Sequence, residues 1–174
     1  MSDSRRPRAV LWAVVLAWAL APACSWTLKF TDAAFPEGLE TVTVADFDNS
    51  ASFVAPGLSQ RIAEALRDKF TRETNVVVTD QDGSDWTFRG TITRYEITPI
   101  APTGNETTAL NRLTIAVQVA FEDRLDPDAD WTSTFSRFAD YDAGQQLSDV
   151  EDGLIDDIGG QLVQDIFNKV ASNW

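Results

Sequence analysis

Apolar and polar side chains alternate most regularly in the middle of the chain. From Arg112 to Phe121, apolar residues at odd positions are separated by polar or small residues at even positions. A period of two held over this length predicts a strand in a sheet that buries one face. The apolar positions are Leu113, Ile115, Val117, Val119 and Phe121.

Other segments also have strand patterns. Residues 86–97 alternate with one change of phase near Tyr95, which predicts a β-bulge. Residues 131–141 predict another long strand, with a phase change of its own near Phe138. Alternating or β-branched runs predict shorter strands at residues 26–30, 41–47 and 75–79.

Two segments have the helical period instead. Apolar residues recur every fourth position from Leu58 to Phe70 and again from Val150 to Val170. This spacing predicts two amphipathic helices. Ser148 has the spacing of a capping box at the start of the second helix, together with a glutamate three residues later.

Gly159 and Gly160 interrupt the second helical stripe. Glycine inside a helix costs about 1 kcal/mol relative to alanine. We therefore expect a close approach to the sheet, or a kink, at this point.

The predicted order of elements is β-β-α-β-β-β-β-α. Two amphipathic helices can cover one face of such a sheet and leave the other face free. The sequence therefore predicts an α+β fold, a mixed β-sheet with two α-helices packed on one face, in a single domain formed by residues 24–174.

The N-terminal segment, residues 1–23, has the pattern of a lipoprotein signal peptide. Three arginines precede an uncharged apolar run at residues 9–20. That run is shorter than the about 20 residues that a transmembrane helix needs. It fits a secretory signal that ends in small residues.

Cys24, which is the one cysteine of the chain, directly follows this segment. A cysteine in this place is typical of a bacterial lipobox, although Leu20 lies one position earlier than is usual. A lone cysteine cannot form an intramolecular disulfide. We expect Cys24 to be the lipid-attachment site; the alternative is ordinary secretion with a buried thiol.

Composition excludes several classes of function. The net charge of −13 argues against nucleic-acid binding, which needs a basic surface. There is no histidine, so the usual general base and the commonest metal ligand are missing. No phosphate-binding glycine loop is present. We expect no enzymatic activity and no cofactor.

The acidic residues do not form a recognisable metal or catalytic motif. Asp126, Asp128 and Asp130 alternate as at the start of an EF-hand loop, but Trp131 and Arg137 occupy the positions where that loop needs glycine and a bidentate acid. A solvated hairpin tip is the interpretation that we favour. No pair of acids is singled out as a hydrolase would require, and we expect no metal site.

Arg89 and Arg112 are the candidate contacts for an anionic ligand or a partner. They lie at polar positions of two long predicted strands, opposite the apolar residues. A local pair of arginines can bind phosphate or carboxylate in bidentate geometry. The alternative is pairing with acids across the strands, or plain solvation. Arg94 and Arg137 are weaker candidates because the strand phase around them is uncertain.

Several segments in order resemble the LptE-type lipopolysaccharide-assembly lipoproteins of Gram-negative outer membranes. They are the lipobox cysteine before T-L-K-F, then T-V-T-V-A-D-F-D-N, P-G-L-S-Q-R-I-A-E-A-L-R-D-K-F, W-T-F-R-G-T-I-T-R-Y, R-L-T-I-A-V-Q-V-A-F-E-D, W-T-S-T-F-S-R-F-A-D-Y and L-I-D-D-I-G-G-Q-L-V-Q-D-I-F-N-K-V-A-S-N-W. The series covers nearly all of residues 24–174.

The resemblance implies a domain tethered by lipid to the periplasmic face of the outer membrane. It also implies a partner, an LptD-type β-barrel whose lumen such a lipoprotein plugs and whose assembly it assists. Together the two proteins would place lipopolysaccharide on the cell surface. Contact with lipopolysaccharide itself is a further expectation from the resemblance.

A second resemblance comes from another class. V-A-D-F-D-N-S, the amphipathic helix that follows and V-V-V-T-D also resemble lipoproteins of the curli-secretion type and regulators of cell-wall synthases. The two long strands and the closing helix of the C-terminal half favour the lipopolysaccharide-assembly interpretation.

Overall fold

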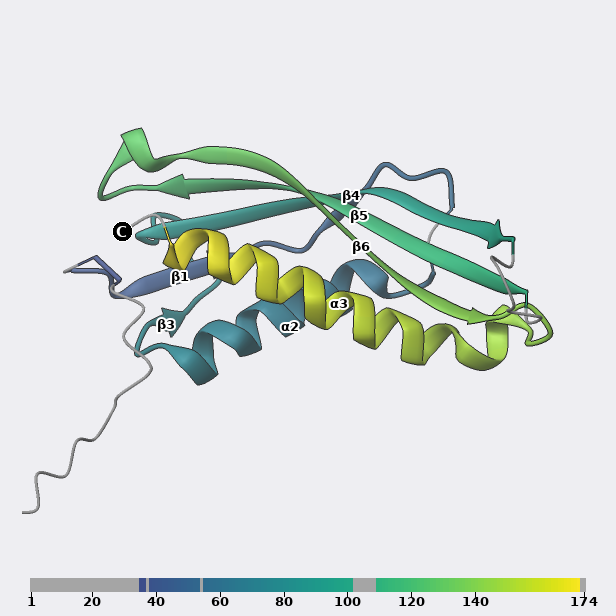
Figure 1. Cartoon of the computed structure of the whole chain (residues 1–174). Helices are drawn as coiled ribbons and strands as arrows, with labels where there is room; N and C mark the ends of the chain where they lie inside the picture. The colour runs from purple at the N-terminus through teal and green to yellow at the C-terminus, as the bar shows by residue number, and fades with distance from the viewer. Residues whose placement is uncertain (1–34, 37, 54, 102–108, 173–174) are drawn as a thin grey trace, which may run out of the picture. The chain divides into compact units, whose positions relative to one another are not determined.

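The computed structural model describes residues 35–36, 38–53, 55–101 and 109–172. In this part of the chain a six-stranded mixed sheet packs against two helices that lie on the same face (Figure 1). The predicted α+β fold is confirmed. The predicted signal peptide, Cys24 and the predicted strand at residues 26–30 lie outside the described residues.

Three long strands form the antiparallel part of the sheet. They are β4 (Trp86–Ile100), β5 (Leu110–Asp123) and β6 (Trp131–Asp142). β5 lies in the middle and pairs with β4 along one edge and with β6 along the other. The five apolar residues predicted for the buried face of β5 are all buried, which confirms the alternation.

Three short strands complete the sheet next to β4. They are β1 (Thr41–Val44), β2 (Asp48–Asn49) and β3 (Val77–Val78). β1 and β2 both pair in parallel with β4, and β3 pairs in parallel with β1, so the strand order is β3-β1-β4-β5-β6. The predicted strand at residues 41–47 is therefore shorter, and Phe47, which is buried, follows it as the chain passes from β1 to β2.

The helices are α2 (Leu58–Glu73) and α3 (Leu147–Ala171). Both pack through the predicted apolar stripes: Leu58, Ile62, Leu66 and Phe70 of α2 are buried, as are Ile158, Leu162, Ile166 and Val170 of α3. Among the described residues, no helix is both long and apolar enough to cross a membrane.

The predicted capping box of α3 is wrong. Gln146 is the residue before the first turn, and no side chain caps it. Glu151 instead accepts a hydrogen bond from the hydroxyl of Tyr95 on β4, at 2.5 Å. Burial and this contact with a carboxylate raise the pKa of Tyr95 well above its ordinary value. Glu151 therefore joins the helix to the sheet rather than closing the helix end.

Of the two alternatives that we expected at Gly159 and Gly160, a close approach to the sheet or a kink, the close approach is wrong. A methyl group added at either position would meet no neighbouring atom within 4 Å outside the local helix backbone. These glycines instead line a small cavity of about 130 Å³ between α3 and α2, together with Ile62, Ala65 and Ile155.

β4 contains a bulge, as predicted. Its register with β5 shifts between Ile92 and Arg94, so Thr93 has no partner on β5. Before the bulge, Phe88 and Ile92 point to the helices, and after it the odd-numbered Tyr95 does. The extra residue therefore changes which residues face the helices, from even-numbered ones before the bulge to odd-numbered ones after it.

The phase change predicted in β6 is wrong. β6 pairs with β5 without a register shift from Trp131 to Asp142. Phe138 is simply an apolar residue on the polar side of the sheet, where the guanidinium of Arg112 lies 3.6 Å above the centre of its ring. This cation–π contact explains an apolar side chain in a polar position.

Buried carboxylates close the end of the sheet where β4 begins. Asp85 accepts hydrogen bonds from the backbone N–H groups of Glu40 and Thr41, at 3.0 and 2.9 Å, from the Thr41 hydroxyl and from Arg124. Burial raises the pKa of Asp85, but these hydrogen bonds together outweigh it and lower the pKa from 3.8 to about 2. Asp123 similarly accepts the indole N–H of Trp86, at 2.8 Å.

Gly90 should resist substitution because a Cβ atom there would overlap the ring of Phe47. We expect Gly90→Ala to lower the free energy of unfolding by about 1–3 kcal/mol, as overpacking usually does. Urea unfolding would measure this. Gly160→Ala is the matched control, and it should raise stability by up to about 1 kcal/mol. Equal effects of the two substitutions would contradict the packing that we describe.

Asp85→Asn should lower the free energy of unfolding by about 2–4 kcal/mol near neutral pH, because a buried carboxylate that accepts several hydrogen bonds is lost. The pKa of Asp85 is lower in the folded state, so its contribution is complete above the unfolded pKa of 3.8 and is lost as the pH falls toward 2. Urea unfolding at about pH 7 and about pH 3 should therefore show that the difference in the free energy of unfolding between wild type and Asp85→Asn is smaller at the lower pH. A difference in the free energy of unfolding that stays the same at both pH values would mean that the charge of Asp85 contributes nothing to stability.

Candidate functional site

The side of the sheet opposite the two helices, which we call the open face, is polar. Side chains alternate between the two faces of a strand, so the even-numbered residues of β5 and β6 point to it. Hydroxyl and amide groups dominate its centre. They belong to Thr87, Thr91, Thr114, Gln118, Thr132, Thr134 and Ser136.

Arg89 lies on the open face, as the alternation predicted. It is paired with Ala120 across the β4–β5 ladder. Its guanidinium donates to the carboxylate of Glu122, which is also on β5. The side chain of Arg89 is 59% exposed, so this ion pair lies in water and leaves the guanidinium accessible.

Arg112 lies on the same face but in a more constrained position. Its Nε and one terminal nitrogen donate to the two oxygens of Asp140 on β6, at 2.7 and 2.9 Å. Donation of these hydrogen bonds to Asp140 raises the pKa of Arg112, and the same bonds lower the pKa of Asp140. With the ring of Phe138 below it, the guanidinium of Arg112 is held in one orientation.

The structure does not bring the two arginines together. Arg89 lies opposite Ala120, and Arg112 lies eight residues from Ala120 along the same strand. At about 3.4 Å per residue in an antiparallel strand, this separation is about 27 Å. Any ligand contact by these arginines would therefore involve two separate places on the open face.

Arg94 and Arg137, the weaker candidates for an anionic contact, lie in different surroundings. Arg94 follows the bulge on the open face, 4.0 Å from Glu96. Arg137 points to the helix side of the sheet and donates to both oxygens of Asp165 on α3, at 2.6 Å each. Every arginine of the long strands thus has a carboxylate beside it.

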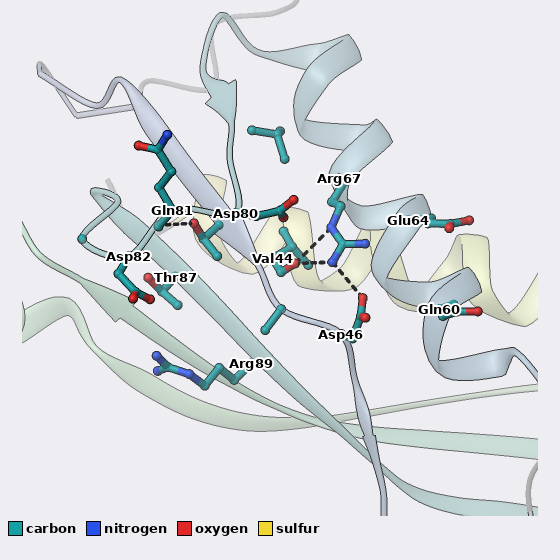
Figure 2. Close-up of a pocket in the computed structure, with 14 residues that line it drawn as sticks. Val44, Asp46, Gln60, Glu64, Arg67, Asp80, Gln81, Asp82, Thr87 and Arg89 are labelled. Atoms are coloured by element: carbon teal, nitrogen blue, oxygen red, sulfur yellow. Dashed lines mark hydrogen bonds and ion pairs between the residues drawn. The ribbon is translucent and has the colours of Figure 1, made fainter.

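A groove of about 700 Å³ opens beside Arg89, at the carboxyl ends of the parallel strands β1 and β3 (Figure 2). Arg67 reaches into it from α2 and donates twice to the C=O of Val44, at 3.0 and 2.6 Å, and once to Asp46, at 2.9 Å. Ligands of α/β proteins often bind outside the carboxyl ends of parallel strands. The groove is therefore the hollow with the most suitable position for a ligand.

The lining of this groove is more acidic than basic. Its carboxylates belong to Asp46, Glu64, Asp80 and Asp82, whereas its cations are Arg67 and Arg89. The guanidinium of Arg67 already donates to the C=O of Val44 and to Asp46 at the end of β1. The groove thus suits a hydroxyl-rich or cationic group better than an anion, with Arg89 as its exposed positive charge.

The described part of the chain contains no group of three or more His, Cys, Asp or Glu side chains placed to hold a metal ion. The aspartates at residues 126–130 form the predicted hairpin tip, a short 3-10 turn (Pro127–Ala129) between β5 and β6. Asp126 accepts the N–H of Asp128 there, and Asp130 accepts the N–H of Asp123. These carboxylates thus bond to backbone N–H groups of the turn and of the end of β5.

Comparison with models of protein families identifies the family of this chain. The model of the LptE family, described as lipopolysaccharide-assembly, matches residues 39–170. The match extends from just before β1 to the last turn of α3. The chain belongs to the LptE family.

Solved structures of several other bacterial proteins share the fold at low sequence identity. The rare lipoprotein B from Shewanella oneidensis is 15% identical, with a TM-score of 0.52, over 77% of this chain and 96% of that one. A lipoprotein B from Nitrosomonas europaea is 16% identical, with a TM-score of 0.50, over 84% and 90% of the two chains. A Xanthomonas campestris protein is 10% identical, with a TM-score of 0.52, over 81% and 89%. No curated protein matches the sequence significantly.

Proposed function

We propose that this LptE-family protein is a lipid-anchored outer-membrane component of lipopolysaccharide transport and assembly, and that it acts by binding rather than by catalysis. The observation that carries the proposal is the family match over residues 39–170. The absence of histidine from the sequence agrees with a role in binding.

The partner in this proposal is an LptD-type β-barrel, whose lumen the domain plugs and whose assembly it assists. The interior of an outer-membrane barrel is polar, whereas its outer wall is apolar. The open face of the sheet presents hydroxyl groups and arginines that are paired with acids. Such a face suits contact with a polar wall and its water, and it would be costly to bury in lipid.

The anchor in this proposal is an acyl group on Cys24. Each buried CH₂ of an acyl chain contributes about 0.8 kcal/mol to membrane attachment. Lipid at Cys24 would hold the domain at the periplasmic face of the outer membrane, next to the opening of the partner barrel. The acidic surface would not draw the domain to anionic lipids.

Arg89 and Arg112 would contact the sugar-phosphate part of lipopolysaccharide. A guanidinium has five N–H donors, and Asp140 takes two of those of Arg112. Three donors therefore remain for a phosphate at an arginine that is already oriented. Arg89 has one carboxylate contact in water, which a phosphate can displace or share.

A pull-down of the tagged, lipidated protein from detergent-solubilised outer membranes tests the partner. We expect a β-barrel of the lipopolysaccharide-export kind in about equal amount, as mass spectrometry and stained gels would show. Cys24→Ala is the matched control for the anchor: it removes the lipid, so that retention of the protein in the membrane fraction should depend on the partner barrel alone. Recovery of a cell-wall synthase, or of rings of this protein alone, would move the function to the second class.

The double substitution Arg89→Ala, Arg112→Ala tests the anionic contact. Lipopolysaccharide affinity should fall about tenfold or more, because each hydrogen bond to a charged group is worth about 1.5–3 kcal/mol. Arg72→Ala is the control, since Arg72 is an exposed arginine of α2 that also has an acid beside it. Unchanged lipopolysaccharide binding in the double variant, measured by calorimetry, would remove both residues from the site.

A further inference from the structure

Several edges of the sheet are open in the described residues. β3 and β2 are edge strands, but each has two residues. A longer open edge is the part of β4 beyond its pairing with β2, where β5 is its one neighbour. The other long one is the outer edge of β6, which also pairs with β5 alone. An unpaired edge offers a row of N–H and C=O groups to any extended chain, and proteins normally guard such edges.

The open part of β4 is guarded. Before the bulge, the C=O groups of Phe88 and Ile92 accept hydrogen bonds from the N–H groups of Ala45 and Ser50, so the even-numbered residues point away from β5. Beyond the bulge, the backbone groups of the odd-numbered residues point away from β5, and Pro99 is one of these residues. Proline has no N–H to offer, and both proline and bulges discourage pairing at an edge.

The outer edge of β6 has neither device. The N–H of Ala143 donates to the C=O of Ala109 at 3.0 Å, just beyond the paired residues of β5 and β6. Hydrogen-bonded pairs alternate in an antiparallel ladder, so the odd-numbered residues of β6 bond to β5 and the even-numbered residues point outward. The outward groups belong to Thr132, Thr134, Ser136, Phe138 and Asp140.

This edge, which we call the β6 edge, has one guard, the charged side chain of Arg137, which points to the helix side and pairs with Asp165. None of the described residues makes a hydrogen bond to the outward N–H and C=O groups between Thr132 and Asp140. The 12 residues of β6 include no proline, no lysine and no bulge. An edge of this length and regularity is a template for an added strand.

The charge beside the β6 edge indicates what kind of strand would fit. Asp157, Gln161 and Asp165 recur every four residues and so lie in one row on α3. Arg137 of β6 contacts this row through Asp165, and a groove of about 420 Å³ lies among the same residues. Asp165 is paired with Arg137, and Asp156 lies 3.7 Å from Arg61 of α2, so Asp157 is the carboxylate of the groove that has no ion pair among the described residues.

We propose that the β6 edge is a docking site for an extended segment of a partner protein that carries basic side chains at alternate positions. The added strand would bond to the outward groups of β6. Its basic side chains would point to the helix side and reach Asp157, and its other side chains would lie beside Thr134 and Ser136 on the open face. A second copy of this chain fits poorly, because it would bring its own acidic α3 to the same place. This inference does not depend on the identity of the membrane partner.

An alternating nonapeptide of threonine and lysine is the probe, and amide hydrogen exchange measured by NMR is the readout. We expect the amides of Thr132, Thr134 and Ser136 to exchange about tenfold more slowly with the peptide bound, because each gains an acceptor. The amides of Ser133 and Phe135 already bond to β5 and should not change. A peptide with the same residues but with its lysines grouped at one end should give no such protection.

Two variants separate strand addition from general attraction. Ser136→Pro removes one outward N–H at an edge position, which proline tolerates, and it should abolish the protection while the amides of Ser133 and Phe135 report an intact fold. Asp157→Asn should weaken peptide binding severalfold, whereas Asp68→Asn on α2 should not.

Three results would each overturn the proposal. The first is no protection of the β6 edge by the alternating peptide, and the second is equal protection by the grouped peptide. The third is protection of the same amides by a concentration-dependent dimer without peptide, which would make a second copy the occupant.

Discussion

The burial of one face of the β4–β5 ladder determines how the rest of the protein packs. Trp86, Phe88 and Ile92 of β4 and the odd-numbered apolar residues of β5 are almost completely buried on that face. Apolar area removed from water contributes about 25 cal/mol per Å², so both helices gain by packing on this side and nothing drives them to the other. The arrangement leaves the open face to water or to a partner.

This one-sided packing also separates the charges of the protein. On the open face the arginines of β4 and β5 lie beside acids, so the face has a balanced charge. The excess of acid lies elsewhere, above all on the first half of α3, where Asp149, Asp152, Asp156 and Asp157 are all exposed. A phosphate-bearing ligand and a basic polypeptide would therefore meet different surfaces of the same domain, and the two kinds of contact need not compete.

Local patterns were sufficient to predict the two helices and the longer strands of the described residues, but not the two-residue strand β2 or the pairing of the strands. Alternation predicted β5 and the bulge of β4, and the four-residue period predicted α2 and α3. The continuous register of β6 was missed because Phe138 is apolar yet lies on the polar side of the sheet under the guanidinium of Arg112, a contact between strands that no local pattern contains. Ser148 has the right spacing for a cap, but the glutamate that should complete it bonds to Tyr95 in another element.

The candidate site was predictable only in part for the same reason. Alternation predicted that Arg89 and Arg112 lie on the polar face of the sheet, and both do. Their distance along the ladder depends on the register of β4 with β5, which a single sequence does not reveal. The groove beside Arg89 is built from the β1 end, α2 and the loop after β3 together. Only the three-dimensional arrangement brings these segments to one place.

The bulge at Thr93 has a consequence for the proline that follows it. If Thr93 paired with β5 instead of bulging out, the residues after it would keep the alternation of the first half of β4, and Pro99 would face β5 instead of the free side of the strand. A proline in that orientation deletes a hydrogen bond from the interior of a sheet. Tyr95 would at the same time leave the core and lose Glu151. One unpaired residue thus turns Pro99 to the free side of the strand and Tyr95 into the core.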